Sequence, residues 1–492
     1  MAAMTDPNRE QSVVDSVPHQ LLIDGSWRPA GSGATTVVED PATEKALCEV
    51  ADAGRDDGLA ALAAADRAQP AFAAMAPRER SDILRRAYEA VLARVEDLAL
   101  LMTLEMGKPL AEARGEVTYA AEFLRWFSEE AVRVDGGFAV SPDGRNRFLV
   151  MRQAVGVSVF VTPWNFPLAM GTRKIAPAIA AGCAMVVKPA PQTPLSMLAL
   201  AQILQEVGLP DGVLNVVTTT DAADVVEPVL RDGRARKLSF TGSTAVGRLL
   251  LEQASSKVLR TSMELGGNAA FLVFDDADVD RAVEGAMQAK MRNMGEACTA
   301  ANRFLVQRGI ADEFSRRLAD RMGALTVGRG TEDGVQVGPM IDGKGRDKIV
   351  DLVGDAVAHG AEVVLGGERA DGPGYFYRPT VLTGVPAHSR LNSEEIFGPV
   401  APITVFDDEA QALADANATD FGLVDYVFTQ DLDRALRVSE RLEAGMVGLN
   451  TGLVSNPAAP FGGIKQSGLG REGGTVGIDE FLETKYVAIA TA

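Results

Sequence analysis

The chain has 492 residues, which is longer than one hydrophobic core usually supports, so we expect several domains. Its hydrophobic fraction of 47% and charged fraction of 23% are those of an ordinary soluble globular protein. The formal net charge of −19 argues against nucleic acid and anionic membranes as partners, and no uninterrupted apolar run reaches the roughly 18 residues of a membrane span.

The first 20 residues lack the apolar core of a signal peptide and the arginine-rich, acid-poor character of a transit peptide, so we expect residues 1–20 to be a disordered tail. Short strands and turns are predicted over residues 21–51. Helical periodicity then dominates residues 57–132, with a break at 107–109. A strand is predicted at 147–151.

The middle third of the chain alternates between strand-like and helix-like segments. Apolar runs begin near Val155, Ala184, Val213, Ala235 and Val258. This alternation predicts an α/β fold, with right-handed βαβ units and a parallel sheet covered by helices. A second α/β pattern follows over residues 271–454, and a strand is predicted at 486–490. Because such sheets bind ligands beyond the carboxyl ends of their strands, we look for chemistry there.

Two strand ends carry features that suit a dinucleotide. Gly242 and Gly247 lie between a strand and a helix, where backbone N–H groups can approach a pyrophosphate. A plain strand-to-helix turn explains them equally well. Lys188 follows another strand and can hold a ribose, although a solvated lysine is the simpler interpretation.

Three further residues supply parts of one reaction. Cys298 lies on a predicted loop after Gly295, where a thiol can be exposed with a lowered pKa; the alternative is a small buried side chain. Glu264 ends a buried-looking strand, so burial can raise its pKa and make it a base for water; the alternative is an acid in a surface turn. Asn165 lies between two aromatic residues and suits an oxyanion hole, or it satisfies a turn.

The cysteine and histidine content narrows the chemistry. Cys48, Cys183 and Cys298 are the only cysteines, and their odd number and wide spacing indicate a reducing, cytoplasmic compartment. The three histidines have no metal-ligand spacing, so no histidine-based metal site is predicted.

Seven motifs, in a single order from about Leu21 onward, resemble those of the aldehyde dehydrogenase superfamily. They are TPWNFP at 162–167, KPA at 188–190, FTGS at 240–243, MELGG at 263–267, GEAC at 295–298, EEIFGP at 394–399 and PFGGIKQSG at 460–468. The resemblance implies a dinucleotide-binding domain of residues 21–132 and 152–265 and a catalytic domain of residues 266–458. It also implies an oligomerisation element, residues 133–151 and 476–492, in a homodimer or homotetramer.

The resemblance also implies roles for single residues. Cys298 matches the nucleophile, Glu264 the general base, Asn165 the oxyanion donor and Lys174 a lysine near the active site. The cofactor contacts implied are Thr162, Pro163, Trp164, Lys188, Ala190, Pro191, Gly242, Ser243, Leu265, Glu395 and Phe397. Because a general base is present, the resemblance implies hydrolysis of a thioester rather than transfer to CoA.

Within this superfamily the chain resembles the succinate-semialdehyde dehydrogenases. Arg173, Arg292 and Ser455 match the two arginines and the serine that hold the distal carboxylate of the substrate. Two guanidinium groups suit a carboxylate because they bind it through bidentate, charge-assisted hydrogen bonds. The simpler alternative is that both arginines pair with local carboxylates. Glutarate semialdehyde and glyceraldehyde-3-phosphate also suit such a pocket, and a catalytically silent protein of the same fold is an alternative of another class.

Two positions depart from the pattern of these relatives. Ala300 stands where many of them carry a second cysteine, so an intramolecular redox switch of that type is not expected. Pro191 stands where NAD-preferring relatives often have a glutamate and NADP-preferring ones a serine. A missing carboxylate does not repel a 2′-phosphate, so NADP is slightly favoured over NAD as the cofactor.

Overall fold

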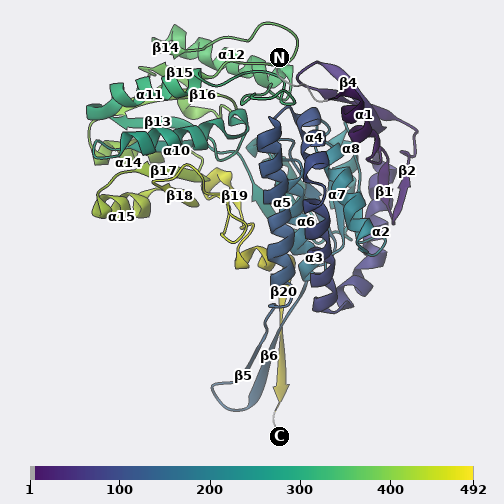
Figure 1. Cartoon of the computed structure of the whole chain (residues 1–492). Helices are drawn as coiled ribbons and strands as arrows, with labels where there is room; N and C mark the ends of the chain where they lie inside the picture. The colour runs from purple at the N-terminus through teal and green to yellow at the C-terminus, as the bar shows by residue number, and fades with distance from the viewer. Residues whose placement is uncertain (1–5, 491–492) are drawn as a thin grey trace.

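The structure is a computed structural model that describes residues 6–490, and it consists of two α/β domains and a projecting β arm (Figure 1). The predicted α/β class is confirmed. None of the helices in the described part of the chain is both long and apolar enough to cross a membrane.

The first domain is built on an eight-stranded sheet. Its strand order is β19-β11-β10-β7-β8-β9-β1-β2, and the five central strands are parallel. These five are the apolar runs predicted from the sequence, and they are almost wholly buried because helices cover both faces. The strands are β1 (Leu21–Ile23), β2 (Ser26–Arg28), β7 (Ser158–Val161), β8 (Met185–Lys188), β9 (Leu214–Val216), β10 (Lys237–Thr241), β11 (Arg260–Glu264) and β19 (Gly468–Leu469).

Helices of the first domain cover this sheet and add a further helical layer on one side (Figure 1). In that layer α5 packs against α3, α4 and α6. The break predicted at residues 107–109 is confirmed: Gly107, with φ 94°, ends α4, and α5 begins directly after Pro109. The helices are α2 (Arg55–Ala74), α3 (Pro77–Leu92), α4 (Val95–Met106), α5 (Leu110–Glu130), α6 (Ala169–Ala181), α7 (Leu195–Glu206), α8 (Ala222–Asp232) and α9 (Thr244–Ser255). A small two-stranded sheet, β3 (Thr35–Asp40) with β4 (Lys45–Ala51), lies outside them.

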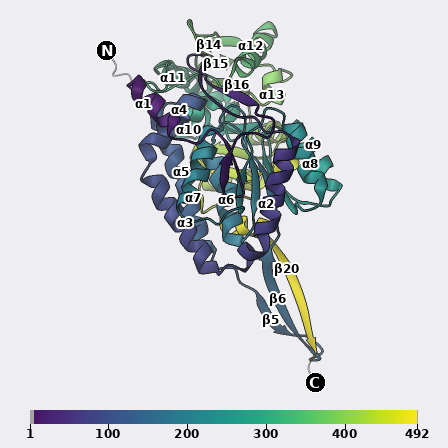
Figure 2. The same cartoon turned by 90° about the vertical axis from the view of Figure 1, so that its right-hand side faces the viewer.

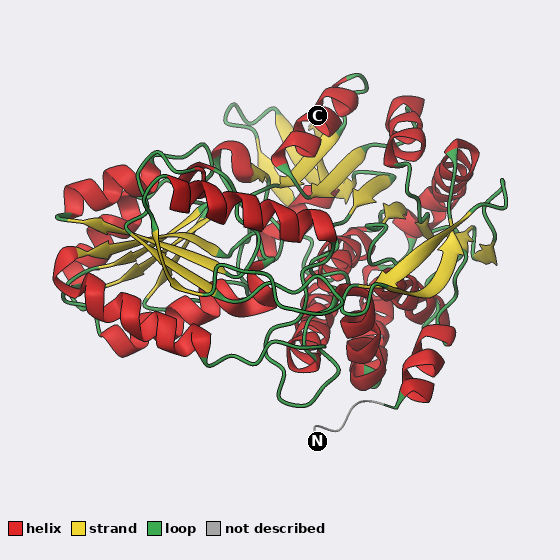
Figure 3. Ribbon diagram, turned by 90° about the horizontal axis from the view of Figure 1, so that it is seen from above, coloured by secondary structure: helices red, strands yellow, loops and turns green. Residues whose placement is uncertain are grey.

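The second domain has a seven-stranded sheet with helices on both sides (Figure 3). Its strand order is β14-β15-β16-β13-β12-β17-β18. The strands are β12 (Ala269–Val273), β13 (Ala301–Gln307), β14 (Glu362–Leu365), β15 (Thr380–Thr383), β16 (Val400–Phe406), β17 (Val424–Phe428) and β18 (Met446–Leu449). The helices are α10 (Val279–Met291), α11 (Ala311–Gly323), α12 (Gly343–Ala358), α13 (Arg390–Ser393), α14 (Glu409–Asn417) and α15 (Leu432–Arg441).

A three-stranded arm projects away from both domains (Figure 2). Its strands are β5 (Gly137–Val140), β6 (Asn146–Ala154) and β20 (Leu482–Ala490). β20 pairs antiparallel with β6 over its whole length, so the C-terminal strand joins the hairpin. Phe138 and Tyr486 on this arm are 69% and 55% exposed, which leaves apolar surface uncovered in the single chain.

The expectation that residues 1–20 form a disordered tail is wrong for most of that segment. Residues 7–15 form α1 (Pro7–Asp15), which the Asp6 side chain caps by accepting a hydrogen bond from the Asn8 N–H. Val13 and Val14 are buried, and Glu10 accepts two hydrogen bonds from Arg329. A partner that follows more than 300 positions later is invisible to local pattern reading. Residues 1–5 lie outside the described part of the chain.

Candidate active site

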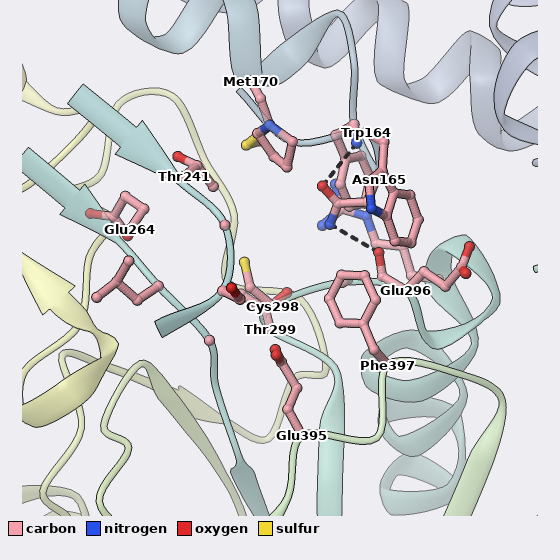
Figure 4. Close-up of a pocket in the computed structure, with 18 of the residues that line it drawn as sticks. Trp164, Asn165, Met170, Thr241, Glu264, Glu296, Cys298, Thr299, Glu395 and Phe397 are labelled. Carbon is pink, nitrogen blue, oxygen red and sulfur yellow. Dashed lines mark hydrogen bonds between the residues drawn. The ribbon is translucent and has the colours of Figure 1, made fainter. Parts of the chain in front are cut away.

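A cavity of about 300 Å³ lies beyond the carboxyl ends of β7, β10 and β11 (Figure 4). Its walls come from the loop after β7, the loop before β13 and segments of the second domain. The structure thus brings together side chains that are far apart in the sequence. Those expected from the sequence that line it are Pro163, Trp164, Asn165, Arg173, Gly242, Ser243, Glu264, Leu265, Arg292, Cys298, Glu395, Phe397 and Ser455.

Cys298 follows a short 3-10 helix, η1 (Arg292–Gly295), and its side chain is half-buried. Burial raises the pKa of its thiol to about 12, and the Arg173 guanidinium opposes this rise only in part. The expected lowering of this pKa is therefore wrong for the structure, because desolvation of a thiolate between two domains outweighs the nearby cations. Gly267 permits the packing, since an added Cβ there would lie 2.4 Å from the Cys298 carbonyl oxygen.

Asn165 lies across the cavity from Glu264, and the Cys298 thiol projects between them (Figure 4). The Asn165 Nδ2 donates to the Glu296 carbonyl over 3.0 Å, and its Oδ1 accepts from the Phe166 N–H over 3.1 Å. These bonds fix the amide plane beside the sulfur and leave one N–H of the amide for an oxyanion.

Glu264 is the last residue of β11, and its carboxyl group is buried. Neither carboxyl oxygen has a hydrogen-bond partner within the described residues. Burial, followed by the neighbouring Glu472 carboxylate, raises the pKa of Glu264 well above its usual range, while Arg173 and Lys174 act against this rise. A carboxylate with a raised pKa is a stronger base than a free one, as activation of water requires.

Lys174 does not line the cavity. It lies on α6, where its Nζ ion-pairs with Glu472 and donates to the Ser239 hydroxyl over 3.0 Å. Glu472 was not among the residues expected from the sequence, yet it is buried and holds Lys174 and Arg173 together. Two adjacent basic residues on a buried helix did signal that an acid must neutralise them, but not which acid.

The three residues expected to hold a substrate carboxylate have different surroundings. Arg292 Nη1 lies 3.4 Å from the Ser455 hydroxyl, so these two residues form one pair. Arg173 instead lies 3.0 Å from Glu472 through its Nε, which agrees with the simpler alternative for this one arginine. Its Nη2 is buried without a hydrogen-bond partner among the described residues, so it retains donor capacity.

Aromatic side chains that the sequence analysis did not select form the walls between these cations. The Arg173 guanidinium lies 3.9 Å from the Phe461 ring centre, and the Arg292 guanidinium 4.8 Å from that of Phe166. Tyr119 of α5 also lines the cavity. Their aromatic character alone gave no signal, because most aromatic residues pack in cores.

The other end of the cavity suits a dinucleotide. The rings of Trp164 and Phe397 meet edge to face at 5.3 Å, and Glu395 accepts a hydrogen bond from the Gly267 N–H. Thr241 presents a buried hydroxyl without a partner in the described chain. A Cβ added at Gly242 would lie 2.5 Å from the Phe240 ring, so a larger residue there would have to displace that ring.

Thr162, Lys188, Ala190 and Pro191 do not line this cavity. Lys188 is the last residue of β8, and the other three follow the neighbouring strands β7 and β8. The Thr162 N–H donates to the Lys188 carbonyl over 3.1 Å, which keeps these two strand ends side by side. Burial lowers the pKa of Lys188 to about 8, and no ion pair to it exists within residues 6–490. An unpaired buried cation at a strand end fits a phosphate- or ribose-bearing cofactor.

A half-buried cysteine between an amide donor and a buried acid, next to a parallel sheet whose strand ends suit a dinucleotide, is the arrangement expected of a dehydrogenase that works through a covalent thiol adduct. Sequence comparison makes this specific: the aldehyde dehydrogenase family matches residues 27–487, and the chain belongs to this family.

Known relatives match along nearly the whole chain. The succinate-semialdehyde dehydrogenase of Paenarthrobacter nicotinovorans is 60% identical over 444 residues, 90% of this chain and 99% of the relative. The glutarate-semialdehyde dehydrogenase of Pseudomonas putida is 49% identical over 471 residues, 96% of this chain and 98% of that protein. Among solved structures, an E. coli NADP dependent enzyme has a TM-score of 0.96 at 48% identity, covering 99% of this chain and 100% of that one.

Proposed function

We propose that the protein oxidises succinate semialdehyde to succinate with NADP or NAD. The observation that carries the proposal is the Arg292–Ser455 pair in the same cavity as Cys298, with the Arg173 guanidinium close by. A short aldehyde that reaches the thiol with one end can thereby meet cations with its other end. The succinate-semialdehyde dehydrogenase at 60% identity supports this substrate.

The proposed reaction begins when the Cys298 thiol, whose pKa burial raises, gives up its proton to water and its sulfur attacks the aldehyde carbon. The oxyanion that forms accepts a hydrogen bond from the Asn165 amide, and one such donor contributes about 10² to 10³ in rate. When bound, NADP or NAD would accept the hydride that leaves the former aldehyde carbon, and the adduct on Cys298 would thereby become a thioester. Glu264 then takes a proton from water, which hydrolyses the thioester and frees the thiol.

NADP is the cofactor that we favour. Pro191 places no carboxylate near the strand ends of β7 and β8, and Lys188 offers an unpaired cation there. Both features suit a 2′-phosphate, because its charge would be attracted rather than repelled. The similar structure from E. coli is that of an NADP dependent enzyme, which supports the same choice.

Glutarate semialdehyde is the second candidate substrate. It has the same two functional groups with one more methylene group, and the relative from Pseudomonas putida acts on it by name. A single methylene is usually worth only about 1 to 3 kcal/mol in discrimination, so both aldehydes can be substrates with different efficiencies.

We also infer a cytoplasmic homodimer or homotetramer that assembles through residues 133–151 and 476–492. The exposed Phe138 and Tyr486 of the arm support assembly, and three free cysteines support a reducing compartment. In this assembly residues 21–132 and 152–265 bind the dinucleotide and residues 266–458 carry the nucleophile.

Steady-state kinetics with succinate semialdehyde, glutarate semialdehyde and butanal test the proposal with either cofactor. In Arg292→Ala we expect KM for succinate semialdehyde to rise about tenfold or more, since a charge-assisted hydrogen bond contributes roughly 1.5 to 3 kcal/mol, while kinetics with butanal change little. Arg281→Ala, an exposed position on α10, the helix that directly precedes Arg292, is the matched control and should behave like the wild type. Equal effects of Arg292→Ala on both aldehydes would exclude a carboxylate site at Arg292.

A further inference from the structure

Behind the wall that carries Asn165 lies a buried ion pair that takes no direct part in the proposed reaction. Lys108, between α4 and α5, is 1% exposed and pairs with the equally buried Glu116 of α5. The Lys108 Nζ also donates to the Asn165 carbonyl oxygen over 2.7 Å and lies 4.2 Å from the Phe166 ring centre. The ion pair therefore contacts the backbone of the oxyanion donor itself.

Glu116 ties this contact to the helix that follows. Its Oε1 accepts hydrogen bonds from the N–H groups of Leu168 and Ala169, 3.0 and 3.2 Å away. Those N–H groups are at the start of α6, which has no capping side chain of its own. α5 lies beside α6 along its length (Figure 1). Lys108 and Glu116 thus hold both sides of the segment 165–169.

A second set of bonds joins this segment to the nucleophile loop. The Asn293 Nδ2 donates to the Asn165 carbonyl over 3.0 Å and to the Glu296 carbonyl over 2.9 Å. Asn293 has φ 54°, and its N–H donates to Glu112, another acid of α5. The Asn165 carbonyl is therefore the point where the bonds from Lys108 and from the Cys298 loop meet.

Stability alone does not explain this arrangement. Burying two charges costs several kcal/mol in desolvation, and apolar residues of similar volume are often as stable. What an apolar pair cannot provide is a donor aimed at the Asn165 carbonyl. Misplacement of an oxyanion donor by about 1 Å can cost roughly 10²-fold in rate, so fixing that backbone has a catalytic consequence.

We propose that Lys108 and Glu116 are positioning residues that hold the Asn165 amide at the oxyanion site. The proposal rests on the proposed function only in that Cys298 attacks a carbonyl carbon. It does not depend on which aldehyde is bound, because the pair acts at the reacting end of the substrate.

The test uses Lys108→Met, which keeps the length of the side chain, and Glu116→Gln, which keeps an oxygen for the α6 N–H groups. We expect kcat to fall about 10- to 100-fold with both succinate semialdehyde and butanal, with little change in KM. The rate of Cys298 alkylation by iodoacetamide should stay near that of the wild type, because this displacement forms no oxyanion. If Lys108→Met does not fold, Glu116→Gln decides the question by the same measurements.

Arg80→Met is the matched control, because Arg80 is also a buried cation that donates to a backbone carbonyl, that of Ala180 at the far end of α6. The Arg80→Met substitution should lower the melting temperature without lowering kcat.

In an Asn165→Ala background, Lys108→Met should cause no further loss of kcat, since Lys108 acts through the Asn165 amide. Additive losses, an equal loss of kcat in Arg80→Met, or an unchanged kcat in both test variants would overturn the proposal. A loss of kcat with succinate semialdehyde but not with butanal would also overturn the proposal. If the wild type turns over neither aldehyde, the proposed function is refuted instead.

Discussion

The two walls beside Cys298, one carrying Asn165 and the other Glu264, differ in how Asn165 and Glu264 themselves are hydrogen-bonded. On the Asn165 wall, both polar atoms of the Asn165 side chain and both carboxyl oxygens of Glu116 have partners. On the Glu264 wall, neither oxygen of Glu264 has a hydrogen-bond partner in the described chain. Arg173 lies close to Glu472, yet its Nε and Nη2 lack hydrogen-bond geometry to any described group.

This contrast matches two different tasks. A group that stabilises a developing charge works best when it is fixed before the reaction, because no energy is then spent on turning it. A group that must bind water, exchange a proton or meet a substrate needs free hydrogen-bonding capacity. Changes on the Asn165 wall should therefore slow formation of the thioester, and changes on the Glu264 wall should slow its hydrolysis.

Glu264→Gln should have the largest effect on turnover. It removes the base and keeps the shape, so we expect steady-state turnover to fall about 10²- to 10⁴-fold, the usual contribution of a general base. A rapid burst of reduced cofactor, near one equivalent per Cys298, should remain in stopped-flow absorbance. Cys298→Ala is the control and should abolish burst and turnover while cofactor binding persists. If Glu264→Gln shows no burst, Glu264 is also needed to form the thioester, which would contradict the assignment of this wall to hydrolysis alone.

Asn165→Ala should follow, with a loss of about 10²- to 10³-fold in kcat, because one oxyanion donor is removed. In contrast to Glu264→Gln, the burst itself should slow by a similar factor in the same stopped-flow assay. A burst as fast as that of the wild type, followed by slow turnover, would show that both walls act on hydrolysis.

Glu472→Gln should change the pH dependence more than the maximal rate. After burial, the Glu472 charge is the next cause of the raised pKa of Glu264, and it also occupies Arg173 and Lys174. Removing the Glu472 charge ends its repulsion of the Glu264 carboxylate and frees Arg173 and Lys174 to stabilise that carboxylate. Both effects lower the pKa of Glu264. Since the base must be ionised, the acidic limb of turnover against pH should move to lower pH, and a shift to higher pH would refute this coupling.

The sequence patterns predicted the parallel strands and their order along the chain well, because buried strands between helices are continuous apolar runs. Most catalytic candidates could be sought after the ends of these runs, because parallel sheets bind ligands beyond the carboxyl ends of their strands. The order of the seven motifs along the chain then indicated which residues to choose. The N-terminal helix α1 was missed because its burial depends on only two valines and on the distant Arg329. The pKa of Cys298 was misjudged because loop residues were expected to be solvated, whereas two domains enclose this loop.

The sequence by itself determined which side chains are available: a thiol, an acid, an amide and two arginines. Only the tertiary structure decided how these groups act on one another. It paired Lys174 with Glu472, 298 positions away, turned Arg173 toward the same acid, and placed Lys108 on the Asn165 carbonyl. The physical reason is that the pKa of a group depends on burial and neighbouring charges, and its position on the hydrogen bonds around it, all of which packing between distant segments sets.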